Sequence, residues 1–338
     1  MRRITAWGAT IALSAALGAC GSANDSSTSP GSANSDKAGV DYPVTIKNCG
    51  RTLTFNGPPK RAITTFQPTL ELMLALGLQD SIVGREDYTE GPVLPEQKAA
   101  FQSIRSISKP SAFPTKEVML SLHPDFVISD FLANFDSSQG AATVNELKAA
   151  GAQVYIQTGR CTGGTKATFE DDYTDLTNLG KIFGVPDRAQ KAIATMKAKI
   201  AAVKKKLQGR PPVRVIFYDY KMGPLSLMTS GLSQVLQAAG AQNLTVSATK
   251  HETDVSVEKA VAENPQHILL WDYGQKTNAD SIKYLKSVLA TTDAVKHDKL
   301  TPIEGAYTVP GYRTADGVMK VASILHPDLF PKGAGSTP

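Results

Sequence analysis

Residues 186–208 of this 338-residue chain read PDRAQKAIATMKAKIAAVKKKLQ, and this stretch decides the fold. Its apolar side chains recur at alternating steps of four and three, which is the spacing of one helix face. These residues are Ala189, Ile193, Met196, Ile200, Val203 and Leu207. Gly209 and the prolines that follow end the pattern. About twenty residues at ~1.5 Å each make a rod of ~30 Å, so we predict one long connecting helix over residues 186–209.

Short apolar strands alternate with helical segments on both sides of this helix. The sequence predicts a hairpin over 42–55. It then predicts strands over 61–65, 81–84, 126–129 and 154–157, and helices over 69–76, 115–122 and 143–150. After the connecting helix, strands are expected over 214–217 and 267–270, and helices over 232–239, 256–263 and 314–325. Such alternation favours parallel sheets covered by helices. We therefore expect an α/β fold with two Rossmann-like lobes, 41–185 and 210–332, a rigid helix joining them, a ligand cleft between them, and a tail over 333–338.

Two segments repeat the same plan. Residues 116–129 and 257–271 each hold a helix that ends at a proline, Pro124 or Pro265, followed by an apolar strand. The repeat is weak because helix, proline and strand often follow one another by chance. It supports two similar lobes.

The first 40 residues are expected to lie outside the fold. Residues 1–19 have a basic start, an apolar run and small residues near the end, as an export signal does, and the run is too short to span a membrane. The sequence LGAC at 17–20 is similar to the bacterial lipobox, which implies a lipid such as palmitate on Cys20. We therefore expect a lipid-anchored protein on the outer face of the plasma membrane. The alternative is ordinary cleavage beside an incidental cysteine. Residues 20–40 contain no Leu, Ile or aromatic residue and are predicted to be a disordered tether.

Two cysteines remain once Cys20 carries a lipid. Cys49 and Cys161 would lie in a compartment where thiols oxidise, so we expect a disulfide between them. Two separate buried thiols are the alternative. The overall charge is +5, but without Arg2 and Arg3 it falls to 34 basic against 31 acidic residues, or +3. Nucleic-acid binders usually carry a stronger basic bias, so no nucleic-acid partner is expected.

Aromatic residues and arginines follow the predicted strands, where open α/β sheets bind their ligands. Rings can contact a planar or amphiphilic ligand, and guanidinium groups can meet its negative charge or stack on its π faces. The candidate ligand-binding residues are Phe66, Arg85, Tyr88, Phe131, Arg160, Tyr218, Tyr220, Trp271, Tyr273, Tyr307, Tyr312 and Arg313. As alternatives, these rings close the ends of a core, Arg313 begins the last helix, and Arg160 merely follows the cysteine bridge.

Short motifs also occur in a fixed order along the chain. They are PKR at 59–61, Glu71, LG at 76–77, IVG at 82–84, LHPDFVI at 122–128, LG and IFG within 179–184, VS at 255–256 with Glu258, NP at 264–265, and PG at 310–311 with Arg313. In this order they resemble the substrate-binding proteins of ABC importers for iron-siderophores, haem and cobalamin. The likeness runs from about residue 40 to the end. It departs from the family at 288–292, which read VLATT where a Trp often stands.

The resemblance implies a shallow cleft between two lobes whose opening the long helix limits. It also implies one surface glutamate on each lobe that pairs with arginines of the permease, and the motifs place these on Glu71 and Glu258. Each exposed pair would contribute ~1 kcal/mol or less, so together they would orient the protein on its partner rather than hold it tightly. Ordinary solvent-facing glutamates are the alternative.

These observations predict a monomeric binding protein, with no enzymatic activity and no cofactor, that captures a ferric siderophore and delivers it to an ABC permease and its ATPase. Cobalamin or haem is the second prediction, and no protein side chain is expected to bind metal directly. A bare-metal protein, an exported enzyme and a structural surface protein are weaker alternatives. Five scattered histidines and three Ser-x-x-Lys patterns without companion motifs give them little support. The siderophore class stays open, because arginines suit anionic complexes whereas tyrosine and tryptophan also suit hydroxamates.

Overall fold

The computed structural model describes residues 40–110, 112–161, 163, 167–220, 225–228, 233–244, 252–272 and 275–330. The predictions on Cys20, the signal, residues 20–39 of the tether, Tyr273 and the tail therefore lie outside the described residues. By its contacts the chain from Val40 to Pro338 is one compact unit. The search of the described part found no helix with the length and apolar character needed to span a bilayer.

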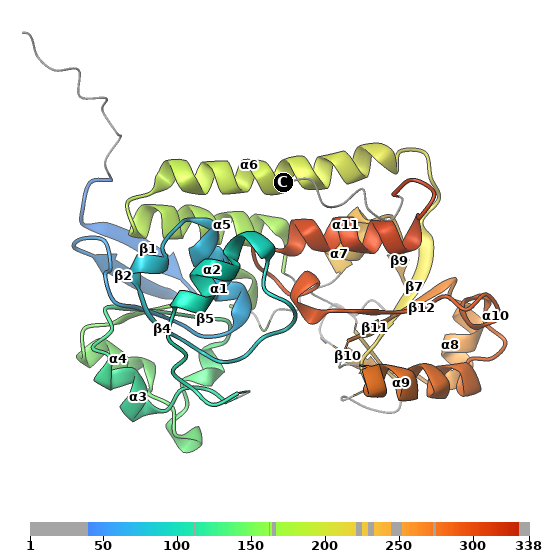
Figure 1. Ribbon diagram of the computed structural model, residues 1–338, viewed down its shortest axis with the longest axis horizontal. Coiled ribbons are helices and arrows are strands. Elements are labelled where there is room, and N and C mark those ends of the chain that lie inside the picture. The colour runs from blue at the N-terminus through green and yellow to red at the C-terminus, as the bar shows by residue number, and fades with distance from the viewer. Residues whose placement is uncertain are drawn as a thin grey trace, which may run out of the picture. The chain divides into compact units, whose positions relative to one another are not determined.

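The first half of this unit, coloured blue to green in Figure 1, is built on a four-stranded parallel sheet, and the strand order is β4-β3-β5-β6. Its strands are β3 (Ala62–Thr64), β4 (Ile82–Arg85), β5 (Phe126–Ser129) and β6 (Gln153–Ile156). Its α-helices are α1 (Gln67–Ala75), α2 (Lys98–Ser103), α3 (Lys116–Ser121), α4 (Val144–Ala149) and α5 (Phe169–Ile182). The predicted hairpin is confirmed as the antiparallel pair β1 (Val44–Asn48) and β2 (Arg51–Phe55).

The second half has a mixed sheet with the order β10-β8-β7-β11-β12, and β9 also pairs with β7. Its strands are β7 (Val213–Tyr218), β8 (Ser226–Met228), β9 (Ala241–Asn243), β10 (Glu252–Asp254), β11 (His267–Trp271) and β12 (Leu300–Ile303). Its helices are α7 (Ser233–Ala238), α8 (Val257–Glu263), α9 (Gln275–Val288), α10 (Asp293–Lys296) and α11 (Thr314–Leu325). Strands β7, β11 and β12 are parallel, so their carboxyl ends lie at one edge. Helices between parallel neighbours make this arrangement possible.

The predicted connecting helix is α6 (Pro186–Lys206), and Figure 1 shows it running along one side of both halves. Its buried face includes Met196, Ile200 and Val203, and it packs against α5 and α11. Gly180 on α5 allows close approach, because a Cβ there would lie 2.6 Å from the Cβ of Ala189. One apolar cluster continues from the β1–β2 hairpin through α6 to β7 and α11. The two sheets are therefore joined by a shared core as well as by the chain, and the exact lobe boundaries at 41–185 and 210–332 stay a prediction.

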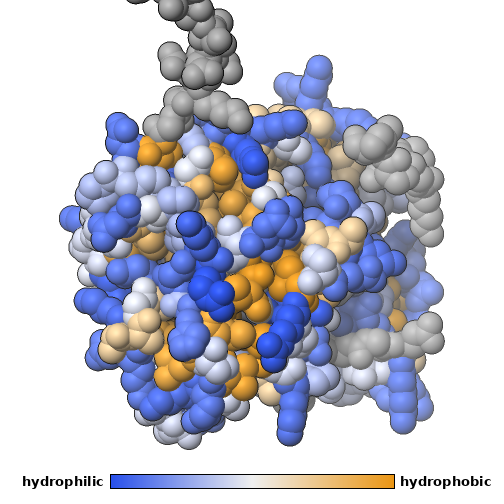
Figure 2. All heavy atoms as spheres, turned by 60° about the vertical axis from the view of Figure 1, so that its left-hand side comes forward, coloured by the Kyte–Doolittle hydropathy of each residue, from blue (hydrophilic) through white to orange (hydrophobic). Residues whose placement is uncertain are grey.

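Large hydrophobic side chains are mostly covered in the described part of the chain. Leu132 and Tyr220 are the exposed ones there, at 47% and 40%. Figure 2 shows that hydrophobic residues also reach the surface between hydrophilic ones on the face where the first half comes forward. A mixed surface of this kind is normal for a folded protein and does not by itself indicate a partner.

Candidate functional site

The carboxyl ends of the first sheet carry a row of chemically distinctive side chains. The spatial order of these side chains along the sheet edge follows the strand order β4-β3-β5-β6. We call this set the first row: Glu86, Tyr88 and Glu90 after β4, Phe66 after β3, Asp130 and Phe131 after β5, and Arg160 after β6. Charged members of the row affect one another's ionisation, because the charges of Asp130 and Glu90 raise the pKa of Arg160 against the effect of its burial. The row is therefore a cluster in space, as the sequence predicts for strand ends.

Phe66 is held in an unusual backbone conformation at the centre of the first row. Its φ of 72° lies in the left-handed region that non-glycine residues rarely adopt. Its backbone N–H donates to Oε2 of Glu86 at 2.7 Å, and its ring stacks on that of Tyr88 with centroids 5.7 Å apart. Such strain persists only where surrounding contacts enforce it and is concentrated at functional sites.

Two carboxyl groups of this row, those of Glu86 and Asp130, resist ionisation. Burial raises the pKa of Glu86 to about 7, the Phe66 N–H opposes the rise, and the charge of Asp130 adds to it. Burial also raises the pKa of Asp130, which accepts a hydrogen bond from Nδ2 of Asn134 at 2.8 Å. A positive group close to these carboxyls would favour their charged form.

Arg160 is the cation of the first row. Its guanidinium carbon lies 4.7 Å from the ring centroid of Phe131, and the residue is 9% exposed. Burial lowers its pKa, and the charge of Asp130 opposes that effect. An arginine keeps its charge even so, because its ordinary pKa is far above neutrality. Arg160 therefore combines a stacking contact with a nearby carboxylate.

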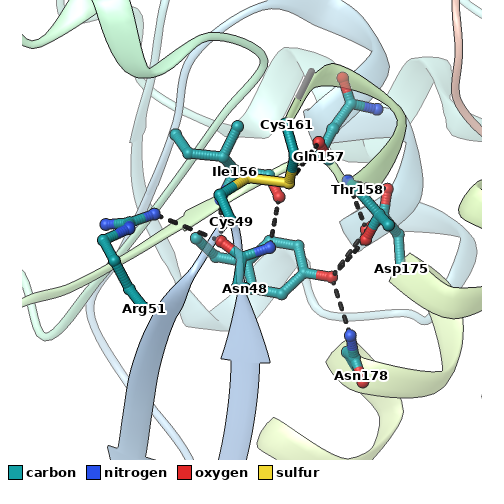
Figure 3. Close-up of a disulfide and its surroundings, with 10 residues drawn as sticks. Asn48, Cys49, Arg51, Ile156, Gln157, Thr158, Cys161, Asp175 and Asn178 are labelled. Carbon is teal, nitrogen blue, oxygen red and sulfur yellow. Dashed lines mark hydrogen bonds between the residues drawn. A yellow bond between two sulfur atoms is a disulfide. The ribbon is translucent and has the colours of Figure 1, made fainter. Parts of the chain in front are cut away.

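The predicted disulfide between Cys49 and Cys161 is present (Figure 3). It anchors the segment after β6, in which Arg160 directly precedes Cys161. The two Cα atoms are 5.0 Å apart. Beside the bridge, Asn48 exchanges two hydrogen bonds with the backbone of Ile156, at 2.7 and 2.8 Å. Thr158 donates its backbone N–H to buried Asp175 at 3.0 Å. The hairpin turn, the end of β6 and α5 together fix the position of Arg160.

A second row follows the parallel strands of the second sheet. It consists of Asp219 and Tyr220 after β7, Trp271 and Asp272 at the end of β11, and Glu304 after β12. Trp271 is half-buried, and its ring stacks on Phe217 with centroids 6.1 Å apart. The expectation for Tyr218 is wrong, because it ends β7 with 4% exposure and packs against Tyr284 in the core.

The two rows meet at Gly305. A Cβ at this position would lie 2.5 Å from Oε2 of Glu90 and 2.3 Å from a ring carbon of Trp271. The backbone N–H of Ala306 donates to the carbonyl of Glu90 at 3.0 Å. Because Gly305 has no side chain, the Glu90 carboxylate of the first row and the Trp271 ring of the second row can both pack against it.

Glu71 and Arg313 form a buried ion pair, which overturns two expectations. Each residue is 2% exposed, and Arg313 donates to both carboxylate oxygens of Glu71 and, through Nη1, to the carbonyl of Pro92 at 2.6 Å. Burial raises the pKa of Glu71, and the charge of Arg313 opposes that rise. The prediction that Glu71 is a surface glutamate is wrong because the residues from Gln67 to Leu74 on α1 are all buried. Arg313 likewise does not face a ligand; it is the N-cap residue of α11, as the alternative had it.

Three further candidates are occupied by local contacts. The guanidinium carbon of Arg85 lies 4.0 Å from the ring centroid of Phe101, and its Nη1 pairs with Asp87 at 3.2 Å. Tyr307 and Tyr312 are partly buried rings packed against the main core. These contacts lend no support to the expectation that Arg85 meets a ligand's charge, which stays a prediction, and the two tyrosines pack against the same core as α11.

Two cavities of about 280 and 290 Å³ lie between α5 and α6, away from both rows. Both are lined by Glu170, Tyr173 and Lys197, and Nζ of Lys197 lies 4.7 Å from the centroid of the Tyr173 ring. Among the residues that the structure describes, no three His, Cys, Asp or Glu side chains are grouped so that they could hold a metal ion.

Glu117 and Glu258 occupy matching places in the two halves. Each is exposed and stands in the first turn of a helix, α3 or α8. A hydroxyl caps each helix: that of Thr115 accepts from the N–H of Val118, and that of Ser256 from the N–H of Lys259 at 3.2 Å. Sequence reasoning missed Glu117, although the repeat of 116–129 and 257–271 pairs it with Glu258.

Comparison with known proteins agrees with this architecture. A family model described as "Periplasmic binding protein" matches residues 63–305. The "Uncharacterized ABC transporter substrate-binding lipoprotein YvrC" of Bacillus subtilis is 23% identical over 97% of this chain and 99% of its own. The "Vitamin B12-binding protein" of Vibrio campbellii is 24% identical over 62% of this chain and 70% of its own. The solved structure of an "ABC-type Fe3+-hydroxamate transport system" from Saccharomonospora viridis is similar with a TM-score of 0.69 and 25% identity, and the match covers 85% of this chain and 100% of that one.

Proposed function

Because this chain belongs to the periplasmic binding protein family, we propose that it captures a ferric siderophore outside the cytoplasm and delivers it to an ABC permease. The ligand binds between the two rows, with rings of Phe66, Tyr88 and Trp271 against its organic shell. The observation that supports this most strongly is the meeting of the rows at Gly305, where a strained, polar strand-end cluster faces a tryptophan. The similarity to a hydroxamate transport structure is in line with this ligand.

Trp271 gives this proposal a direct test, because Trp7 is the other tryptophan of the chain and lies in its first 39 residues. A ferric complex that binds beside Trp271 should quench its fluorescence as the full-length protein is titrated. Trp271→Phe should lose that signal while calorimetry still detects binding. No quenching and no heat with any ferric chelate would contradict the proposal.

Cobalamin is the second candidate, and the similarity to a vitamin B12-binding protein favours it. Both ligands place an organic shell around a metal, so the same rows of rings can serve either. A panel that includes cobalamin and haem separates the ligands: tight binding of a corrinoid with no response to ferric siderophores would replace the first candidate by the second.

Docking to the permease is assigned to Glu117 and Glu258. Both are exposed, and hydrogen bonds to the Glu258 carboxylate, first from its own backbone N–H and then from the Ser256 side chain, lower the pKa of Glu258, so it stays ionised. Replacing both by Ala should abolish uptake and leave ligand affinity unchanged. Asp80→Ala and Glu263→Ala remove exposed carboxylates from the same halves and should leave uptake unchanged. Normal uptake by the double variant would reject this role.

The lipid on Cys20 completes the proposal, since a tethered binding protein stays near its permease. Cys20→Ser should abolish incorporation of radiolabelled palmitate and release the protein from the membrane fraction. Palmitate that still enters the variant protein would show that the anchor lies elsewhere.

A further inference from the structure

We propose that the exposed side of α6 rests on an anionic phospholipid surface, which it contacts through lysines that no carboxylate of the described protein neutralises. This inference goes beyond ligand capture, and it rests on the proposed lipid anchor only for keeping the protein near a membrane. It gives α6 a second role besides joining the two halves.

Positive charge is concentrated on α6 and on the few residues after it. Residues 186–210 contain eight lysines and arginines and one acidic residue, Asp187, so their charge is +7. The chain without Arg2 and Arg3 has 34 basic and 31 acidic residues, so 26 basic and 30 acidic residues, or −4, lie outside this segment. The excess of basic over acidic residues therefore comes from this one helix.

The lysines lie on the side of α6 that the rest of the protein does not cover. The buried residues of the helix are Ala189, Ala192, Met196, Ile200 and Val203. The exposed residues include Lys191, Lys197, Lys204, Lys205 and Lys206, with Ala194, Ala198, Ala201 and Ala202 between them. Because alanine side chains are short and uncharged, a surface laid on this side can approach closely enough to meet the lysines.

The charge of these five lysines is not neutralised within the protein. Of the cations on and just after α6, Lys199 pairs with Asp316 at 2.6 Å, and Arg210 pairs with Asp328. For the five exposed lysines, no carboxylate of the described residues lies within ion-pair distance. They are therefore available to negative groups outside the protein.

These charges are spread along the helix rather than gathered around one point. Lys191 and Lys205 are 14 positions apart, which is about 21 Å along a helix. One small anion cannot meet charges at that spacing, but a layer of phosphate headgroups meets all of them at once. Lysines near an anionic bilayer each strengthen binding about fivefold. The shape of the charged side therefore fits a phospholipid surface.

The start of the described chain also lies beside α6. The hydroxyl of Tyr42 donates to the carbonyl of Ile182 at 2.8 Å, at the end of α5 and just before α6 begins. Val40 packs against the same core as α6 and stands 20 positions after Cys20. A flexible chain of that length spans about 25 Å. A lipid on Cys20 would therefore keep this end of α6 close to a bilayer, which favours a membrane over an acidic protein as the partner.

Contact through α6 differs from docking to the permease. Glu117 and Glu258 stand on α3 and α8, which lie across the sheets from α6 (Figure 1). When α6 rests on the membrane, these glutamates point away from it, so docking requires the protein to leave this position. A contact made by exposed charges is weakened by salt and is reversible, which permits that release.

The test measures how fast individual lysines react on two kinds of vesicle. Protein purified from the membrane fraction is placed on vesicles of phosphatidylcholine, alone or with an equal part of phosphatidylglycerol, and treated with an uncharged acylating reagent. We expect Lys191 and Lys205 to react at least about fivefold more slowly on the anionic vesicles. Lys98 and Lys148 are exposed outside α6 and should react equally on both. High salt should remove the difference.

Each outcome separates this inference from the proposed anchor, and none concerns the ligand. Unprotected α6 lysines on anionic vesicles overturn the inference, and protein that stays on both kinds of vesicle leaves the anchor standing. If these lysines are then protected in whole cells, an acidic protein is the partner instead. Protein that binds only the anionic vesicles, with its α6 lysines protected, supports the inference and contradicts the anchor. Protein that binds neither kind overturns both.

Substitutions test the assigned lysines, with the remaining Lys197 as the reporter. The α6 variant replaces Lys191, Lys204 and Lys205 by Gln, and the control variant replaces Lys60, Lys98 and Lys148, which are also exposed, by Gln. Both variants lose the same charge. Lys197 should stay protected on anionic vesicles in the control variant and lose its protection in the α6 variant. Equal protection in the two variants overturns the assignment to α6.

Discussion

Two arginines near the junction of the sheets, Arg313 and Arg160, lie beside carboxylates and serve different ends. Arg313 is 2% exposed and donates its hydrogen bonds to Glu71 and a backbone carbonyl, so it connects α1 to the start of α11. Arg160 stacks on Phe131 at a strand end, and a disulfide anchors its segment. The comparison teaches that residue type and strand-end position alone do not identify a ligand-binding arginine. The burial of the arginine and the number of partners that its guanidinium group already has must also be known.

The largest expected effect comes from breaking the buried pair. Arg313→Ala leaves Glu71 as an uncompensated buried charge and should lower the free energy of unfolding by about 3–5 kcal/mol. Urea denaturation measures this loss. Glu71→Gln combined with Arg313→Met should recover most of it, and a single variant as stable as the parent would show that the pair is not structural.

The disulfide comes next, since it supports the other arginine. Cys49→Ser with Cys161→Ser opens a link across 112 residues of sequence and should lower the free energy of unfolding by about 2–5 kcal/mol. Ligand affinity should also fall, because the segment bearing Arg160 loses its anchor. Urea denaturation measures the loss of stability, and calorimetry measures the loss of affinity. An unchanged affinity would show that the disulfide does not position the binding site.

The pH dependence of Glu86 gives an intermediate effect. Its pKa in the folded protein is about 7, above the ordinary 4.5, so folding favours the protonated form. Its contribution is therefore fully favourable below pH 4.5 and is lost as the pH rises through 7, by roughly 3 kcal/mol in all. Comparing denaturation of the parent and Glu86→Gln at pH 5 and pH 8 isolates this contribution, since other buried acids are common to both. Identical pH profiles would contradict it.

Arg160→Ala should have the smallest effect on folding and a clear one on binding. Its stacking contact with Phe131 contributes about 1 kcal/mol, and it is not hydrogen-bonded to Asp130 as Arg313 is to Glu71, so stability should fall less than for Arg313→Ala. Affinity for an uncharged ferric trihydroxamate should fall about tenfold. Arg85→Ala is the matched control, because Arg85 pairs with Asp87 and packs on Phe101, both outside the two rows, so its loss should leave affinity unchanged. Equal effects of the two variants would remove the distinction between site and packing arginines.

Sequence periodicity predicted those elements whose buried face is apolar. The helix α6 and the hairpin were found for this reason, and α11 was predicted with its observed bounds, Thr314–Leu325. Helix α5 was missed because its buried face includes Asp172 and Asp175, which interrupt the apolar pattern. Helix α9 has buried Asn278 and Ser281, with the same consequence.

The site was predicted less completely, for physical reasons that particular residues show. Phe66, Tyr88 and Arg160 each follow a predicted strand. The sequence could therefore predict that they lie together at one edge of the sheet. The burial of Glu71 was not, because α1 is covered around its circumference and no polar stripe marks an outer face. Tyr218 was misplaced by a single position, since β7 extends one residue beyond the predicted end.

The most direct test of the account is a crystal structure of the complex with an uncharged ferric trihydroxamate, with iron located by its anomalous scattering. The account predicts one iron peak between the two rows, with the organic shell against Phe66, Tyr88 and Trp271. An iron peak in the cavities beside Tyr173, between α5 and α6, would contradict it.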